Sequence, residues 1–226
     1  MVGSLRHVVK YRPDISAAMD LLGCCLTFPT EELLKCAYHT LVYLARTRKL
    51  GVTYSKHAPN AFKLSALADS NWRPNAFKLS ALAPRTRSTS GFCIFLAGAS
   101  ISSCCRRQGC IAMSSTEAEL VALAECAIEL ICVRGVLTSL GYEVKGPVEV
   151  GTDNTGAYNL CHRFGAAQHS RHIDRKLYKM RELRGAGIVT VKYVPTDDNT
   201  ADLFTKVLTR QPFEKHRRRV MNLTDK

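Results

Sequence analysis

The order of strand-like and helix-like segments is the feature that most constrains how this chain can fold. Short runs rich in apolar and β-branched residues, a pattern typical of strands, occupy residues 64–68, 89–96, 100–105, 148–153 and 187–194. Ala97-Gly98-Ala99 is typical of a tight turn between the second and third runs. A long apolar pattern predicts a helix from residue 114 to about 140, which Gly141 ends. A strand meander followed by strands that alternate with helices predicts a mixed α/β domain.

Helical patterns also precede and follow the expected strands. Residues 14–47 have helical character in two pieces; Asp14 is expected to cap the first helix, and Thr30-Glu31-Glu32 to start the second. Shorter helices are expected over 154–160, 173–183 and, as the last one, 200–208. The chain is therefore expected to consist of a small helical segment over 1–56, a sheet domain over 57–210 and a basic tail over 211–226.

The segment that leads into the first expected strand occurs twice. Pro59 to Ala68 returns letter for letter at Pro74 to Ala83. Repeat architectures need at least about three stacked copies, so this pair is a short tandem duplication and not a solenoid. The first copy leads into Asp69 and the second into Pro84. Because the two copies are identical, local preference cannot choose which one forms the strand, and both alternatives stay open.

The charge balance favours a polyanionic partner. Lys and Arg number 32 against 19 Asp and Glu, a formal net charge of +13, and basic side chains displace the counterions condensed on nucleic-acid phosphates. Many basic proteins bind no nucleic acid, so the net charge alone does not decide the partner.

The 10 cysteines form no paired C-x-x-C elements, which argues against a zinc module. No apolar run reaches the ~18 residues of a membrane span and no secretory signal is present, so we expect an intracellular protein, cytoplasmic or nuclear, without a membrane partner.

Four carboxylates lie where expected strands end or expected helices begin, at Asp69, Glu119, Asp153 and Asp202. A sheet that brings these ends together would gather like charges, which is costly unless cations neutralise them. Hard oxygen ligands suit Mg²⁺, and two such ions about 4 Å apart can activate a water and stabilise the leaving oxygen of a phosphodiester. Taken alone, each carboxylate is more often a helix cap or a solvated surface charge.

Six motifs follow one another along residues 57–208. They are Ala68-Asp69-Ser70-Asn71-Trp72, Arg87-Ser88-Thr89-Ser90-Gly91-Phe92, Ile101 to Glu119, Thr152-Asp153-Asn154, Arg171-His172-Ile173-Asp174 and Asn199 to Lys206. In this order they resemble the ribonuclease H domain of copia-type retrotransposon Pol polyproteins, which implies a ribonuclease H-like mixed sheet flanked by helices. Val2-Gly3-Ser4-Leu5, Arg12-Pro13-Asp14-Ile15 and Tyr43-Leu44-Ala45 resemble the segment that closes the reverse transcriptase of the same polyproteins.

The resemblance implies that Asp69, Glu119, Asp153 and Asp202 are the catalytic and metal-binding set of a ribonuclease H. Asp69 would bridge two Mg²⁺ ions, for which Mn²⁺ is a substitute. Glu119 and Asp153 would complete one metal site, and Asp202 the other. The implied substrate is the RNA strand of an RNA–DNA hybrid, cleaved to leave a 5′-phosphate and a 3′-hydroxyl. Glu117 is the rival to Glu119, which we prefer because the family's ligand directly precedes an apolar run.

Secondary candidates for contacts with nucleic acid are Arg106, Arg107, Asn154, His169 and His172. The histidines precede a helix, and a structural role at the start of that helix explains them equally well. Runs of charged residues are more often a solvated surface.

The polymerase's metal-binding motif is absent, so no polymerase activity is expected. The resemblance makes residues 1–56 a remnant of the reverse transcriptase C-terminal region, whose body is expected as a covalent neighbour in an intact element. We therefore expect exposed apolar surface on these residues.

Departures from the family's pattern support an alternative function. If the second copy forms the first strand, Pro84 replaces the carboxylate of Asp69 and catalysis is lost. Ser103 stands where the family has Trp, and Cys104 and Cys105 replace serines. The alternative to an RNA–DNA hybrid ribonuclease is therefore a catalytically dead, degenerate nucleic-acid-binding remnant of the element.

Overall fold

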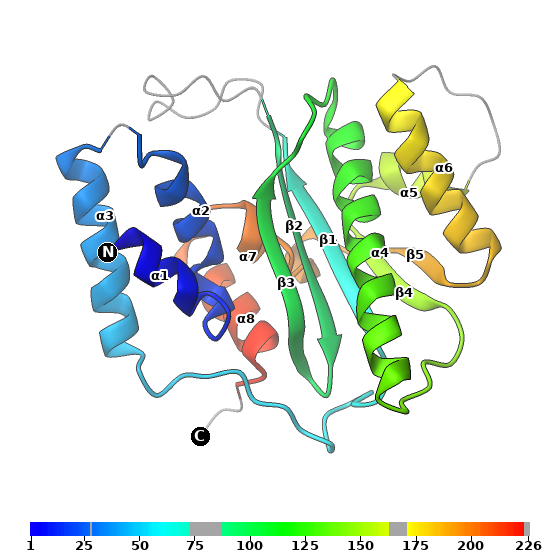
Figure 1. Ribbon diagram of the computed structural model, residues 1–226, viewed down its shortest axis with the longest axis horizontal. Coiled ribbons are helices and arrows are strands. Elements are labelled where there is room, and N and C mark those ends of the chain that lie inside the picture. Colours follow the sequence, from blue (N-terminus) through cyan, green and yellow to red (C-terminus); the bar gives the residue numbers. More distant parts are fainter. Residues whose placement is uncertain (28, 73–86, 163–170, 224–226) are drawn as a thin grey trace.

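A mixed sheet forms the centre of the computed structural model, which describes residues 1–27, 29–72, 87–162 and 171–223. Within these residues the sheet has five strands, which are β1 Ser65–Asn71, β2 Thr89–Leu96, β3 Ala99–Arg107, β4 Val148–Thr152 and β5 Val189–Tyr193. Their order is β3-β2-β1-β4-β5; β2 is antiparallel to both of its neighbours, and β4 is parallel to both of its own. The expected α/β fold class, a mixed sheet flanked by helices, is confirmed (Figure 1).

Helices cover both faces of this sheet (Figure 1). On one face, α4 packs on β1, β2 and β4, and α5 and α6 pack against α4. These helices are α4 Ser115–Ser139, α5 Thr155–His162 and α6 Arg171–Gly185. On the other face lie α2 Ser16–Cys24, α7 Asp202–Thr205 and α8 Arg210–Met221. None of the helices in the described ranges combines the length and the apolar character that crossing a membrane requires.

β1 divides its side chains between two cores. Ala66 and Ala68 belong to the core beneath α4, whereas Leu67 belongs to the core beneath α7 and α8. Because side chains alternate along a strand, Asp69 follows Leu67 onto the α7 side. Of the two alternatives left open by the duplication, the first copy therefore forms the strand. The second copy, residues 74–83, lies outside the described residues.

The hairpin between β2 and β3 turns at Ala97 and Gly98, as predicted. Both residues have a positive φ, 53° and 86°, which is the geometry of a type I′ turn and matches the twist of the two strands. A Cβ on Gly98 would lie 2.7 Å from the Cβ of Ala58. Glycine is therefore required here both for its backbone conformation and for the space that it leaves.

The N-terminal helices have a small core of their own. They are α1 Val2–Val8, α2 and α3 Glu31–Arg46. Thr30 caps α3 as predicted, because its hydroxyl accepts a hydrogen bond from the backbone N–H of Leu33 at 3.3 Å. The other side of α3 exposes Leu34, Tyr38 and Val42, and Tyr38 is 55% exposed. The expectation of exposed apolar surface in residues 1–56 is confirmed.

The prediction that Asp14 caps the first helix is wrong. Asp14 lies in the 3-10 turn Pro13–Ile15, and its two carboxylate oxygens accept hydrogen bonds from Arg12, at 3.0 Å from Nε and 2.7 Å from Nη2. The Tyr43 hydroxyl on α3 also donates to Asp14. Arg217 on α8 donates to that hydroxyl oxygen at 3.1 Å. These distant partners replace the local cap and join α3 and α8 to the start of α2.

The helix predicted over 200–208 is shorter than expected and is not the last one. α7 ends at Thr205, and α8 follows within the expected basic tail. His216, Val220 and Met221 are buried along one side of α8. Residues four apart, as His216 and Val220 are, share one side of a helix, so this pattern packs the basic segment on the sheet instead of leaving it as a solvated end.

Replacing Asp14 by alanine is expected to lower the free energy of unfolding by about 3 to 5 kcal/mol. The change leaves the Arg12 side chain, which is 7% exposed, buried without its carboxylate partner. Urea unfolding of the two proteins measures the difference. The matched control is Glu182→Ala, because Glu182 pairs with Lys179 at the surface, at 3.2 Å, where an ion pair contributes at most about 1 kcal/mol. Equal losses in both variants would contradict the structural role given to Asp14.

Candidate metal centre

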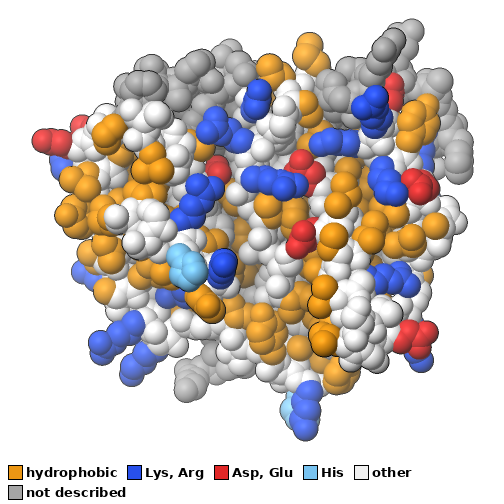
Figure 2. Space-filling model, viewed as in Figure 1, with side chains coloured by type: hydrophobic (Ala, Val, Ile, Leu, Met, Phe, Trp, Pro, Cys, Tyr) orange, Lys and Arg blue, Asp and Glu red, His pale blue; other side chains and the backbone are white. Residues whose placement is uncertain are grey.

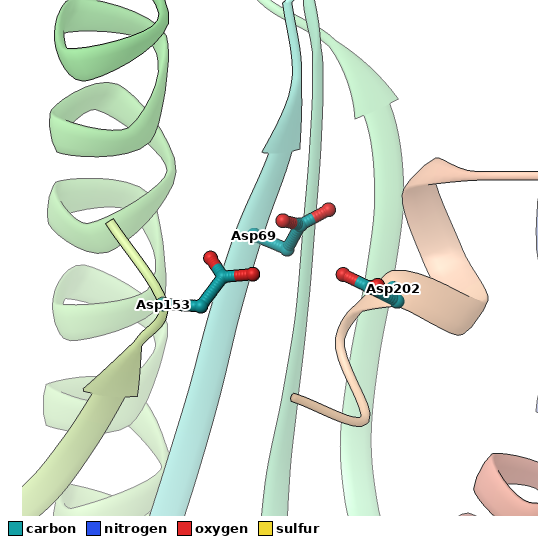
Figure 3. A group of neighbouring side chains, drawn as sticks. All are labelled: Asp69, Asp153 and Asp202. Carbon is teal, nitrogen blue, oxygen red and sulfur yellow. The ribbon is translucent and has the colours of Figure 1, made fainter. Parts of the chain in front are cut away.

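Three aspartates converge at one edge of the sheet, where Figure 3 shows their side chains facing the same region. Asp69 lies near the end of β1, Asp153 directly follows β4, and Asp202 is the first residue of α7. β1 and β4 are parallel neighbours, so their carboxyl ends meet at the same edge. One carboxylate oxygen of each aspartate lies within 4.8 Å of the other two. The fold thus brings together three of the four carboxylates singled out in the sequence.

Close contacts with β1 and β2 fix α7 beside the strands. Asn199 donates through Nδ2 to the carbonyl of Ala68 at 3.1 Å. Asn71, in turn, donates through Nδ2 to the carbonyl of Thr205 at 2.9 Å. On β2, a Cβ added to Gly91 would lie 2.5 Å from Thr205 Cγ2. A glycine inside this strand is therefore what lets α7 come close enough to place Asp202 next to Asp69.

Glu119 lies beside the three aspartates and outside their group. It is 5% exposed, and its Oε1 accepts hydrogen bonds from the backbone N–H and the hydroxyl of Ser70, at 3.0 and 3.1 Å. Burial, together with the nearby charge of Asp69, raises the pKa of Glu119 to about 9. In this state the carboxyl group keeps its proton at neutral pH.

Glu117, the rival to Glu119, has a structural role at the start of α4. Its backbone N–H donates to Oγ of Ser114, the N-cap residue of the helix, at 3.2 Å. Its Oε2 accepts a hydrogen bond from the backbone N–H of Met113 at 2.7 Å. These bonds hold Glu117 at the helix entrance, whereas Glu119 is the residue that borders Asp69.

One lysine balances part of the negative charge. Burial raises the pKa of Asp69, which is 1% exposed, to about 7, although the Lys206 ammonium acts against this shift. Lys206 Nζ lies 2.7 Å from Asp202 Oδ1 and 3.2 Å from Asp69 Oδ1. Burial alone would lower the pKa of Lys206, but the two aspartates raise it above its ordinary value. Burial also raises the pKa of Asp202, against the effect of Lys206.

Asn199, Thr205 and Lys206 belong to the site although no role was predicted for them. The Thr205 hydroxyl donates to Asp69 Oδ2, and the contacts of the other two are given above. All three lie within the last sequence motif. The signal that points to Thr205 and Lys206 is their spacing, because residues three and four positions after Asp202 lie on the same side of a helical turn.

The two arginines predicted to contact nucleic acid end β3. Arg106 forms an ion pair with Glu125 at 3.4 Å, and Arg107 donates to Cys24 Sγ at 3.0 Å. Figure 2 shows lysine and arginine side chains gathered across the upper middle of the face seen in Figure 1, around acidic side chains. Both arginines are exposed at the end of an edge strand, so a contact with a polyanion stays a prediction for them.

The other secondary candidates are placed differently. Asn154 Oδ1 accepts a hydrogen bond from the backbone N–H of Ala157 at 2.9 Å, which caps the first turn of α5. His169 lies outside the described residues. His172 belongs to the first turn of α6, but its side chain is not among those described.

Comparison with known proteins gives no matching protein-family model. Among solved structures, LC11-RNase H1 in complex with an RNA/DNA hybrid is similar to this chain with a TM-score of 0.46 and 15% identity. That similarity covers 63% of this chain and 94% of the other one.

Two transposon polyproteins of Arabidopsis thaliana are related to nearly the whole chain. The identity is 32% over 214 residues with the retrovirus-related Pol polyprotein from transposon RE1, covering 95% of this chain and 14% of that protein. It is 30% over 220 residues with the Pol polyprotein from transposon RE2, covering 97% of this chain and 14% of that protein. The chain therefore spans a small part of the length of these relatives. Together with the motif order, these relationships show that the chain belongs to the family of retrovirus-related Pol polyproteins of transposons.

Proposed function

We propose that this chain is an RNA–DNA hybrid ribonuclease, which cuts within the RNA strand as part of a retrotransposon Pol polyprotein. The observation that carries the proposal is the convergence of Asp69, Asp153 and Asp202 at the carboxyl edge of the sheet. In this proposal residues 57–210 are the ribonuclease domain and residues 1–56 are the end of a reverse transcriptase. The net charge of +13 suits a polyanionic substrate.

The donor set fits a hard divalent cation. Asp69 and Asp202 are buried and Asp153 is half-buried, and carboxylate oxygens are the ligands that Mg²⁺ prefers; Mn²⁺ accepts the same set. When bound, two such ions activate a water and stabilise the leaving oxygen of a phosphodiester. The three aspartates are the residues that would hold them.

The neighbouring residues orient these carboxylates in advance. The Thr205 hydroxyl holds Asp69 Oδ2, and the first turn of α7 fixes Asp202. Glu119 differs from the ligand role that the resemblance implies, because its raised pKa keeps it protonated and bonded to Ser70. Since metal ligands must be deprotonated, Glu119 would join the ligand set only after it loses this proton. Until then its proton is available to an oxygen of water or substrate at the site.

The alternative function, a catalytically dead remnant, rested in part on the second copy taking the first strand. In that arrangement Pro84 would stand where a carboxylate is needed. β1 instead continues from the first copy into Asp69. This removes the observation that tied the remnant to a missing carboxylate, while the departures at Ser103, Cys104 and Cys105 leave the three aspartates in place. The ribonuclease is therefore the function that we carry forward.

Cleavage of a labelled RNA–DNA hybrid with Mg²⁺ is the direct test. The unmodified chain is expected to cut the RNA strand, and Asp69→Asn and Asp153→Asn to reduce the rate by more than about 100-fold, because even partners that only support metal ligands contribute about 10- to 100-fold. The matched control is Asp197→Asn, which makes the same change at an exposed aspartate and should keep full activity. Hybrid binding without cleavage by the unmodified chain would instead support the remnant.

The metal-free protein is expected to lose stability as the pH rises toward 9. Glu119 has a pKa of about 9 in the folded protein against an ordinary value of 4.5. The folded state therefore binds more protons than the unfolded chain between these values. This stabilisation is complete below the unfolded pKa and is lost as the pH rises through the folded pKa. Asp69, with a pKa raised from 3.8 to about 7, adds to the loss over the lower part of the range.

Thermal unfolding in EDTA between about pH 5 and pH 9 measures this loss. The unmodified chain should show a Tm that falls with pH, and Glu119→Gln, neutral at every pH, a shallower fall. Glu182→Gln is the control, because its carboxylate is exposed and pairs with Lys179 at the surface. The same slope in the chain and in both variants would show that Glu119 does not hold its proton as described.

A further inference from the structure

Lys206 contacts two of the three clustered aspartates from one side. Its Nζ lies 2.7 Å from Asp202 Oδ1 and 3.2 Å from Asp69 Oδ1, and it forms no ion pair with Asp153 among the residues that the structure describes. The side chain of Lys206 is 33% exposed, whereas that of Asp69 is 1% exposed. The ammonium group therefore reaches inward from the rim of the site to the buried carboxylates.

A single helical turn supplies both the ammonium and one of its carboxylate partners. The backbone N–H of Lys206 donates to the carbonyl of Asp202 at 2.9 Å. Thr205, which precedes Lys206, donates its hydroxyl to Asp69 Oδ2. The same turn is fixed to β1 through Asn199 and Asn71. The position of Nζ is therefore set by the docking of α7, and does not depend on a long side chain arriving from elsewhere.

We infer that Lys206 is a built-in cation of this centre, which occupies the side between Asp69 and Asp202 and competes there with a divalent ion. The inference rests on the proposed function, since it specifies which part of the proposed metal centre is already neutralised. A cation bound on the Asp153 side leaves both ion pairs of Lys206 in place. A cation bound between Asp69 and Asp202 has to displace the ammonium from the same oxygens. The two proposed metal sites therefore differ in affinity, and Lys206 sets the difference.

Electrostatics explains why one lysine has this effect. Charges a few ångströms apart interact far more strongly near buried groups than in bulk water. Asp69 and Asp202 are buried, so their attraction for Lys206 is weakly screened, and so is the repulsion between Lys206 and a second cation. The rival role for Lys206 is a contact with a phosphate of the nucleic acid. That role changes the affinity for the hybrid and its salt dependence, and leaves the affinity for metal unchanged.

Calorimetric titration of the full chain with Mn²⁺ and with Mg²⁺ is the test. The unmodified chain is expected to bind a first ion more tightly than a second. Lys206→Met should bind the second ion about 10- to 100-fold more tightly than the unmodified chain, the size of effect typical of residues that surround metal ligands. Lys206→Gln should give the same gain while it keeps a hydrogen-bonding side chain for Asp202, so the result does not depend on one variant folding. Lys206→Arg retains the charge and should keep the second ion weakly bound.

Lys63→Met is the matched control. Lys63 also lies 2.7 Å from a carboxylate oxygen, that of Glu149, but it precedes β1 and so lies toward the other end of the strand from Asp69. The substitution removes the same charge and should leave both ion affinities unchanged. Unchanged affinity for the second ion in Lys206→Met and Lys206→Gln, with weaker binding of the hybrid, would overturn the inference in favour of a phosphate contact.

Hybrid cleavage by the same proteins separates this inference from the proposed function. A gain in affinity for the second ion, with no cleavage by the unmodified chain, would support the role of Lys206 and contradict the ribonuclease. Cleavage by the unmodified chain, with no gain in ion affinity in the lysine variants, would support the ribonuclease and overturn the role of Lys206.

Discussion

The close approach of α7 to β1 and β2 is the contact on which the rest of the centre depends. Gly91 makes room for it, since a Cβ at that position would lie 2.9 Å from the Cβ of Phe204. Asn199 then bonds to the carbonyl of Ala68 and fixes the start of the helix beside the strand. Because Asp69 directly follows Ala68 and Asp202 begins α7, this contact determines the distance between two of the three carboxylates. A larger residue at position 91 would push away the helix and, with it, both Asp202 and its lysine partner.

The register of β1 decides whether α7 meets a carboxylate at all. A shift of one residue would turn Asp69 from the α7 side into the apolar core beneath α4. If the second copy of the duplication formed this strand instead, Pro84 would take the position of Asp69. That position lies inside the part of β1 that pairs with β2, which extends to Asn71. Proline cannot donate to a sheet ladder and is avoided in central strands. The residues that follow each copy therefore distinguish two segments whose own sequences are identical.

Elements that depend on local pattern could be predicted from the sequence, whereas contacts between distant residues could not. The turn at Ala97-Gly98 and the cap of α3 at Thr30 follow from neighbouring residues and were found. Asp14 looked like a cap because a carboxylate before a helix has the same local signature whether it caps or pairs with a distant tyrosine. Its partner Tyr43 is 29 residues away, and the partner Asp69 of Lys206 is 137 residues away. The clustering of the aspartates was predicted from the order of motifs, because each carboxylate alone had a simpler explanation.

Closely placed carboxylates store electrostatic free energy, and this fold limits that cost by two different means. Glu119 holds a proton, because burial and the charge of Asp69 raise its pKa to about 9, whereas Lys206 supplies a positive charge beside Asp69 and Asp202. The two means respond differently when a cation binds. Protons leave for the solvent, so they make cation binding depend on pH. The lysine stays attached to α7, so the affinity for a cation depends on where in the site the cation binds. Lys206 also still joins α7 to Asp69 on β1 after the protons have left. The docking of α7 and the affinity for cations are thus coupled through one side chain.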